Sequence, residues 1–133
     1  MSALKIKAAL EIALASITPA LITVFENADY VPVTGTPYQR VNIMSIEPEN
    51  PTFGDNFRRE RGIFQVSLMY PLNAGAGTAI TQAELIRQKF YRGATFVNAG
   101  VTVTIERTPE VSAGYVDVDR WRVPVKVRFY ANI

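Results

Sequence analysis

The carboxylates are the first candidates for chemistry, because the 133 residues include no histidine and no cysteine. Those two residue types supply most general bases, thiolate nucleophiles and zinc ligands. Their absence excludes Ser-His-Asp, Cys-His and HExxH chemistry. Four acids close together in the sequence could supply an acid–base pair of the kind that glycosidases use: Glu47, Glu49, Asp55 and Glu60. No local apolar pocket is predicted that would separate their pKa values, so catalysis is disfavoured.

Two further motifs could bind ligands, and each has a simpler explanation. Asp117 and Asp119 form a D-x-D pair, but calcium and magnesium need several oxygen ligands, and the neighbouring sequence adds none. A turn between the last two strands is favoured there. Segment 73–78, NAGAGT, follows a predicted strand and precedes a helix, yet it lacks the Gly-Lys-Ser/Thr of a phosphate-binding loop. We therefore expect no metal, no cofactor and no enzymatic activity.

Segment 47–62, EPENPTFGDNFRRERG, is the strongest candidate for a contact surface. It is predicted to be a loop, and a loop of this length in a compact domain is usually functional or disordered. Two phenylalanines lie among its charges with no local partner, a pattern typical of protein–protein interfaces. The alternative is that the loop folds back over its own sheet. The candidate interface residues in this segment are Phe53, Asp55, Phe57, Arg58, Arg59 and Arg61.

Basic residues also alternate along the last predicted strand. Arg122, Lys126 and Arg128 face away from its apolar positions. The net charge is only +2, from 14 Lys and Arg against 12 Asp and Glu, which is too small for a dedicated nucleic-acid-binding protein. A solvated sheet face is the simplest explanation, and these three residues are the remaining candidate interface residues.

A helix that begins near the N-terminus is the first element that must position these residues. The apolar spacing predicts a helix over about 3–17, with Leu10, Leu14 and Ile17 towards the core. Three charged residues are expected on its other side: Lys5, Lys7 and Glu11. Because Glu11 interrupts the apolar run, we interpret this segment as a cytoplasmic helix rather than a signal peptide. No stretch approaches the ~20 apolar residues of a membrane-spanning helix.

A second helix and several strands complete the prediction. Thr81 and Glu84 form a capping box that opens a helix running to about Tyr91 and ending at Gly93. A turn is expected at 98–100, and Pro124 suggests an edge position or a bulge in the last strand. The predicted strands cover residues 20–25, 38–46, 63–70, 101–105, 110–116 and 120–130.

The fold class is therefore α+β, with a single twisted, mainly antiparallel sheet and two helices packed on one face. Hydrophobic residues make up 48% of the chain, which suffices for one core. We expect one domain over residues 1–133.

Over essentially its full length, the chain resembles a family of small phage and prophage proteins, the tail terminators (tail completion proteins) of long-tailed bacteriophages. The segments that carry the resemblance are Pro37-Tyr38, Pro51-Thr-Phe-Gly54, Arg61-Gly62, Tyr70-Pro71, Arg107-Thr-Pro109 and the basic closing strand. The resemblance implies a structural virion protein that assembles into a ring, typically a hexamer. That ring caps the tail tube, terminates tail polymerisation and provides the surface for head–tail joining.

The resemblance also implies the partners. They are further copies of the chain, the tail tube protein and a head-side neck or connector protein. DNA would only pass through the ring lumen, and no membrane is involved. The protein would reside in the virion tail or neck, after assembly in the host cytoplasm. The alternatives are another neck component, such as a head-closure or connector protein, and more remotely a small carboxylate-dependent enzyme.

A ring gives the basic closing strand two possible roles. Its cations could line the lumen, or they could pair with acids of the adjacent subunit or of the tube protein. A channel through which DNA slides should not grip the DNA, so we favour the pairing, with Glu47, Glu49 and Asp55 as the candidate acids.

Overall fold

The protein has the expected α+β fold, seen here in a computed structural model. The structure describes residues 2–17, 21–25, 31, 35–49, 59–72, 77–117 and 119–132. Its elements in chain order are α1 (Ser2–Ala15), β1 (Ile22–Val24), β2 (Tyr38–Glu49), β3 (Arg59–Pro71), α2 (Gly77–Lys89), β4 (Thr95–Asn98), β5 (Val101–Ile105), β6 (Glu110–Val111), β7 (Tyr115–Asp117) and β8 (Arg120–Asn132). In the part of the chain that is described, no helix is long and apolar enough to cross a membrane.

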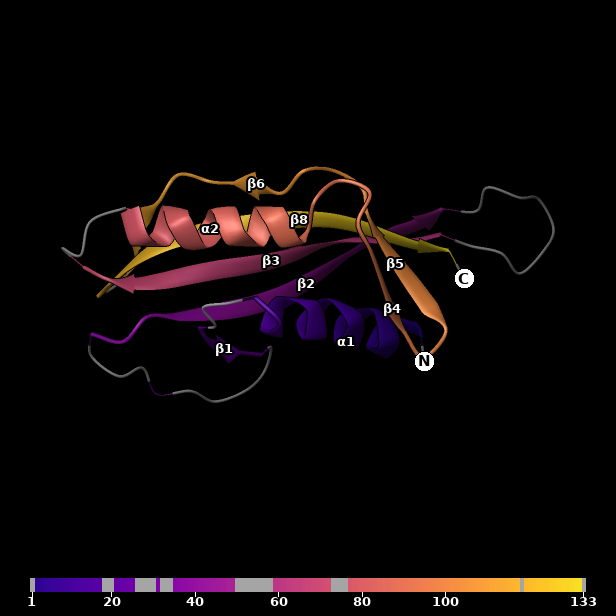
Figure 1. Ribbon diagram of the computed structural model, residues 1–133, viewed down its shortest axis with the longest axis horizontal. Helices are drawn as coiled ribbons and strands as arrows, with labels where there is room; N and C mark the ends of the chain where they lie inside the picture. The colour runs from indigo at the N-terminus through magenta and orange to yellow at the C-terminus, as the bar shows by residue number, and fades with distance from the viewer. Residues whose placement is uncertain are drawn as a thin grey trace.

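The strands form one curled sheet in the order β1-β2-β3-β8-β5-β4 (Figure 1). β1 pairs with β2 in parallel and the other pairs are antiparallel, so the sheet is mixed rather than purely antiparallel. β6 and β7 also pair with β8. They lie along the same side of β8 as β5 and pair with residues nearer its start. β8 is therefore flanked by β3 on one side and by three short strands on the other.

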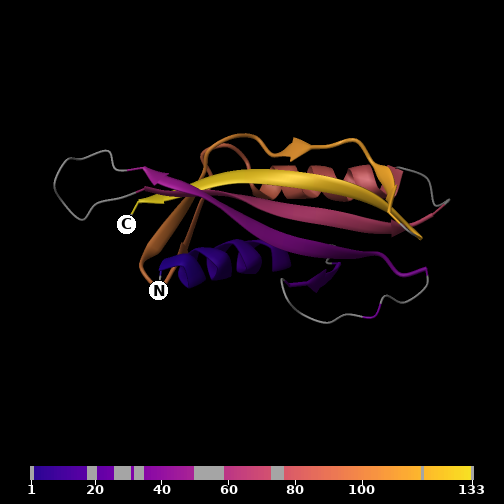
Figure 2. The same cartoon turned by 180° about the vertical axis from the view of Figure 1, so that it is seen from behind.

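Both helices lie on one face of this sheet; β8 passes behind α2 in Figure 1 and in front of it in Figure 2. The core lies between the helices and the sheet. The alternation predicted for β3 and β8 is confirmed, since every second residue of each strand is buried there. The inward residues of these two strands include Phe64, Val66, Leu68, Val123, Val125, Val127 and Phe129.

The helix-side stripe predicted for α1 is also confirmed, because Leu10, Leu14 and Ile17 are buried. The predicted placing of the charges is only partly correct. Lys7 and Glu11 form an ion pair of 2.6 Å on the flank of the helix. The Glu11 side chain is only 16% exposed. The row that faces solvent is apolar, and it contains Leu4 and Ile12.

The capping box predicted at Thr81 is wrong, because α2 begins one turn earlier, at Gly77. The Thr81 hydroxyl donates a hydrogen bond of 2.9 Å to the Gly77 carbonyl. This is the i−4 bond that a threonine inside a helix can make. The remainder of the helix agrees with the prediction: Ile86 and Phe90 are fully buried, and the chain turns at Gly93, whose φ is +88°.

The turn predicted at 98–100 is confirmed, but the strand before it was missed. β4 and β5 form a hairpin in which Asn98 pairs with Val101. Its two-residue loop has positive φ at both positions, 51° at Ala99 and 85° at Gly100, as a type I′ turn requires. β4 is only four residues long, and two of its side chains are exposed, so its apolar signal is weak.

The loop predicted over 47–62 is too long at both ends. β2 continues to Glu49 and β3 begins at Arg59, with Glu49 opposite Arg59. Gly62 is a strand residue rather than part of the loop. A Cβ on Gly62 would lie 2.7 Å from the Phe129 ring and 2.8 Å from the Met44 carbonyl oxygen. The glycine therefore permits close packing within the sheet.

Pro124 lies neither on an edge strand nor in a bulge, so that expectation is wrong. β8 is a central strand, and Pro124 is paired with Ser67 of β3. The carbonyl of Pro124 accepts a hydrogen bond of 2.9 Å from the Ser112 N–H, on the opposite side. The missing N–H of the proline points the same way as this carbonyl. That side is where β6 has ended and β7 has not begun, so the predicted strand 110–116 is split in two.

Candidate assembly interface

The predicted interface residues fall into two groups. Phe53, Asp55, Phe57 and Arg58 lie outside the described residues. The remaining five belong to β3 and β8, and all of them lie on the face of the sheet opposite the helices: Arg59, Arg61, Arg122, Lys126 and Arg128. We call this face the outer face.

Arg59 and Arg61 lie at the start of β3, next to the segment that joins β2 to β3. The Arg59 side chain donates from Nε to Asn132 Oδ1 over 2.9 Å, and its guanidinium lies 4.7 Å from the centre of the Tyr130 ring. Arg61 forms an ion pair of 3.4 Å with Glu106, and about a third of each side chain is exposed. These contacts hold both arginines against the end of β8 and shape the surface at the base of the hairpin.

Arg122 has its acid partner within the same chain. Its guanidinium donates to Asp117 Oδ2 over 2.7 Å and to the Ser67 hydroxyl over 3.1 Å. The D-x-D motif therefore lies in the β7–β8 hairpin, as the favoured explanation predicts. Its first carboxylate forms an ion pair with Arg122. Among the described residues, no group of three potential metal ligands comes together.

Lys126 and Arg128 are half-buried and form no ion pair within the described part of the chain. Both nevertheless lie next to an acid. Glu110 of β6 is paired in register with Lys126, and residues directly opposite one another share a face. The Glu106 N–H donates to the Arg128 carbonyl over 2.9 Å, which places Glu106 beside Arg128.

The outer face thus carries a row of cations on β8 beside a row of three acids, one on β6, one on β7 and one just after β5. The acids are Glu106, Glu110 and Asp117, and the cations are Arg122, Lys126 and Arg128. Opposite charges in neighbouring rows offset one another over a few ångströms. Sequence reasoning did not find Glu106 and Glu110 as partners, because only the strand register brings them to β8.

A small hydrophobic cluster lies on the outer face, near the start of β8. Val24, Tyr38 and Met69 are buried there, away from the main core. Two guanidiniums lie over the Tyr38 ring, those of Arg120 at 5.1 Å and Arg40 at 5.6 Å. Arg120 is itself buried and donates a hydrogen bond of 2.5 Å to the Thr36 carbonyl. These contacts attach the parallel strand β1 and the start of β2 to β8.

The other candidate ligand site, the glycine-rich segment 73–78, is described only in part. Residues 73–76 of the glycine-rich segment lie outside the described residues, and Gly77 and Thr78 form the first turn of α2. Tyr70 is a buried phenol whose burial raises its pKa, so it stays neutral at physiological pH. It packs in the core of the protein.

Comparison with known proteins adds the following findings. A family model described as "Phage tail terminator protein" matches residues 5–129, nearly the whole chain. A solved structure with 23% sequence identity has the same fold, with a TM-score of 0.79 over 100% of this chain and 96% of that one. No curated protein sequence matches significantly.

Proposed function

Because the chain belongs to the phage tail terminator family, we propose that it forms a ring that caps the tail tube, ends tube polymerisation and provides the surface for head–tail joining. Family membership makes it a structural protein of the phage tail and a component of the virion, and it points to a protein that is not an enzyme. The match over residues 5–129 is the observation that carries the proposal. We propose six copies in the ring and one domain over residues 1–133.

The proposed partners follow from this position in the particle. One side of the ring would bind the last ring of tail tube protein, and the other a neck or connector protein of the head. Assembly would take place in the host cytoplasm. DNA would pass through the lumen without specific contacts. A uniformly basic surface would instead hold phosphates strongly at low salt.

Of the three basic residues on β8, two are candidates for an intersubunit contact. Arg122 is bound to Asp117 at 2.7 Å, whereas Lys126 and Arg128 form no ion pair within the described residues. We therefore propose that Lys126 and Arg128 meet acids of the adjacent subunit or of the tube protein, with Glu47, Glu49 and Asp55 as candidates.

Electron microscopy of particles that lack the protein tests the function. With the gene disrupted, we expect unjoined heads and tails of uncontrolled length, because nothing ends the polymerisation of the tube. Supplying the protein in trans should restore particles with joined tails. A tagged copy should appear as one ring at the head-proximal end of the tube. Tails of normal length with the tag on the head side would identify a head-closure or connector protein instead, and normal particles would contradict both assignments.

We also propose that the segment between β2 and β3 contacts a neighbouring subunit or ring. Replacing Phe53 or Phe57 by alanine should leave the subunit folded and reduce the number of joined particles. Truncating an aromatic side chain at an interface hot spot costs more than about 1 kcal/mol. The measurement is the fraction of tails joined to heads in complemented lysates, with the melting temperature of each purified variant. Tyr91→Ala, at an exposed aromatic outside this segment, is the control. Normal joining, or loss of folding, in both phenylalanine variants would contradict the proposal.

A further inference from the structure

The side of α1 that faces solvent is apolar. Its outward row is Leu4, Ala8, Ile12 and Ala15, at spacings that place all four on one face. The Leu4 side chain is 66% exposed and that of Ile12 is 64% exposed. Surface helices normally present polar residues to water, and a helix that is apolar on all sides is normally buried. α1 therefore has one apolar side in the core and a second one that the described residues of this subunit leave uncovered.

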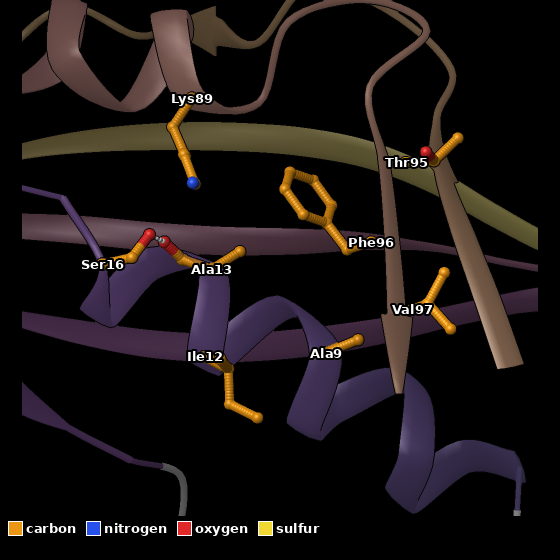
Figure 3. Close-up of a pocket in the computed structure, with 8 residues that line it drawn as sticks. All are labelled: Ala9, Ile12, Ala13, Ser16, Lys89, Thr95, Phe96 and Val97. Atoms are coloured by element: carbon orange, nitrogen blue, oxygen red, sulfur yellow. Dashed lines mark hydrogen bonds between the residues drawn. The ribbon is translucent and has the colours of Figure 1, made fainter. Parts of the chain in front are cut away.

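A groove continues this row towards the sheet. A cavity of about 370 Å³ lies between α1, the end of α2 and β4, and its lining includes Ala9, Ala13 and Phe96 (Figure 3). Figure 3 shows Lys89 extending from α2 into this space, with its ammonium group towards Ser16 and Ala13. Lys89 forms no ion pair within the described residues. The groove thus combines apolar walls with one unpaired cation.

The β7–β8 hairpin combines exposed apolar side chains with an acid, whose charge is opposite to that of Lys89. The side chains of Tyr115 and Val116 are exposed, at 47% and 59%. Asp119, in the turn of the hairpin, is exposed and forms no ion pair within the described part of the chain. Glu110, the other acid without an ion pair there, is paired in register with Lys126. Among the described side chains, Asp119 is therefore an acid without an ion pair that lies beside exposed apolar side chains.

The two surfaces lie at opposite ends of β8. β7 pairs with residues 120–122, at the start of the strand. β5, which carries β4 and one wall of the groove, pairs with residues 129–131 near its end. Arg120 and Phe129 are nine positions apart along the strand, which corresponds to roughly 30 Å. The hairpin cannot fill the groove of its own subunit.

We propose that the groove and the outward row of α1 receive the β7–β8 hairpin of a second copy of this chain, with Asp119 facing Lys89. The inference rests on the proposed ring, because identical subunits around a ring meet through two different surfaces of the same chain. The complementary charges and the positions at opposite ends of β8 favour this pair of surfaces. The contact would cover the apolar side of α1 that the described residues of a lone subunit leave exposed.

Exchange of the two charges tests the contact. Lys89→Glu and Asp119→Lys should each raise the protein concentration at half-assembly about tenfold. The double variant should return it to within about threefold of the wild type, because the pair is restored in reverse. Ile12→Glu should abolish assembly. The measurements are sedimentation of the purified protein over a concentration series, and ring occupancy on isolated tails that lack the protein.

Two control variants and a folding measurement accompany this series. Ile80→Glu makes the same substitution at an exposed position of α2, and Glu84→Lys reverses an exposed acid of α2 that lies outside both surfaces; both should assemble normally. All variants should melt within about 2 °C of the wild type, because the altered side chains are exposed or half-exposed and substitutions at such sites have small effects on stability.

The possible outcomes separate this contact from the function on which it rests. If the Lys89, Asp119 and Ile12 variants still form rings, the surface assignment is wrong while the ring proposal stands. If the single charge variants fail and the double variant does not recover, the hairpin is not the occupant. If the wild-type protein forms no ring in solution or on tails, the proposed function fails and this contact fails with it.

Discussion

Replacing Phe90 by alanine is expected to lower the free energy of unfolding by about 3–5 kcal/mol, the usual cost of truncating a buried phenylalanine. Phe90 is fully buried just after α2. Its ring centre lies 5.9 Å from that of Phe64 in β3 and 5.2 Å from that of Phe96 in β4. The substitution therefore removes contacts that join α2, the centre of the sheet and the β4–β5 hairpin. Urea denaturation at a concentration where the protein is monomeric measures the change.

The next residue in the chain is the matched control. Tyr91 is 60% exposed, and Tyr91→Ala should change stability by no more than about 0.5 kcal/mol. A midpoint shift as small for Phe90→Ala as for Tyr91→Ala would show that the aromatic cluster does not hold these elements together. A change in the slope of the urea transition would instead indicate an altered unfolded or native state.

Leu14→Ala is expected to destabilise the subunit by about 2–5 kcal/mol. Leu14 lies on the buried side of α1 and is 2% exposed. Its loss would leave a cavity where the helix packs in the core. A thermal unfolding scan of the monomer should show a clear fall in melting temperature.

Ile12→Ala gives the comparison on the same helix. Ile12 is on the solvent side, so this change should leave the melting temperature of the monomer almost unaltered. An unchanged melting temperature in Leu14→Ala as well would mean that the buried side of α1 contributes little to folding. Together the two positions separate the side of the helix that folds the subunit from the side that we propose for assembly.

Much of the fold could be predicted from local patterns. The strict alternation of Phe64, Val66 and Leu68 has one simple interpretation, a strand with one face in the core. The spacing of Leu10, Leu14 and Ile17 similarly identifies the buried side of α1. In both cases, apolar residues recur along the sequence at the same period at which the helix or strand turns its side chains towards the core.

Other features depend on contacts that no local pattern contains. Thr81 can cap a helix or hydrogen-bond within one. In the sequence alone, Glu84 three residues later favours the cap. Pro124 suggested an edge because a proline cannot donate to a neighbouring strand, but the gap between β6 and β7 provides the same freedom in the middle of a sheet. The short strand β4 becomes recognisable only through its pairing with β5.

The candidate interface was harder to predict than the core. Arg122, Lys126 and Arg128 were correctly expected to point away from the apolar side of the strand. Two acids of the outer face could not be identified as neighbours of these strands, because Glu106 lies 45 positions of sequence from its partner Arg61 and Glu110 reaches β8 only through the register of β6. Charge pairing on a sheet surface is set by which strands are adjacent, and sequence spacing does not contain that information.

The central position of β8 determines when the sheet can be completed during synthesis of the chain. β8 is the last strand in sequence, yet it joins β3 to β5, β6 and β7. During synthesis, the two halves of the sheet stay unconnected until this strand has left the ribosome. Folding must then close contacts between distant parts of the chain, which is slow compared with local folding. A chain interrupted before residue 120 lacks the strand that unites its sheet, so unfinished copies cannot compete with complete ones for a place on a tail.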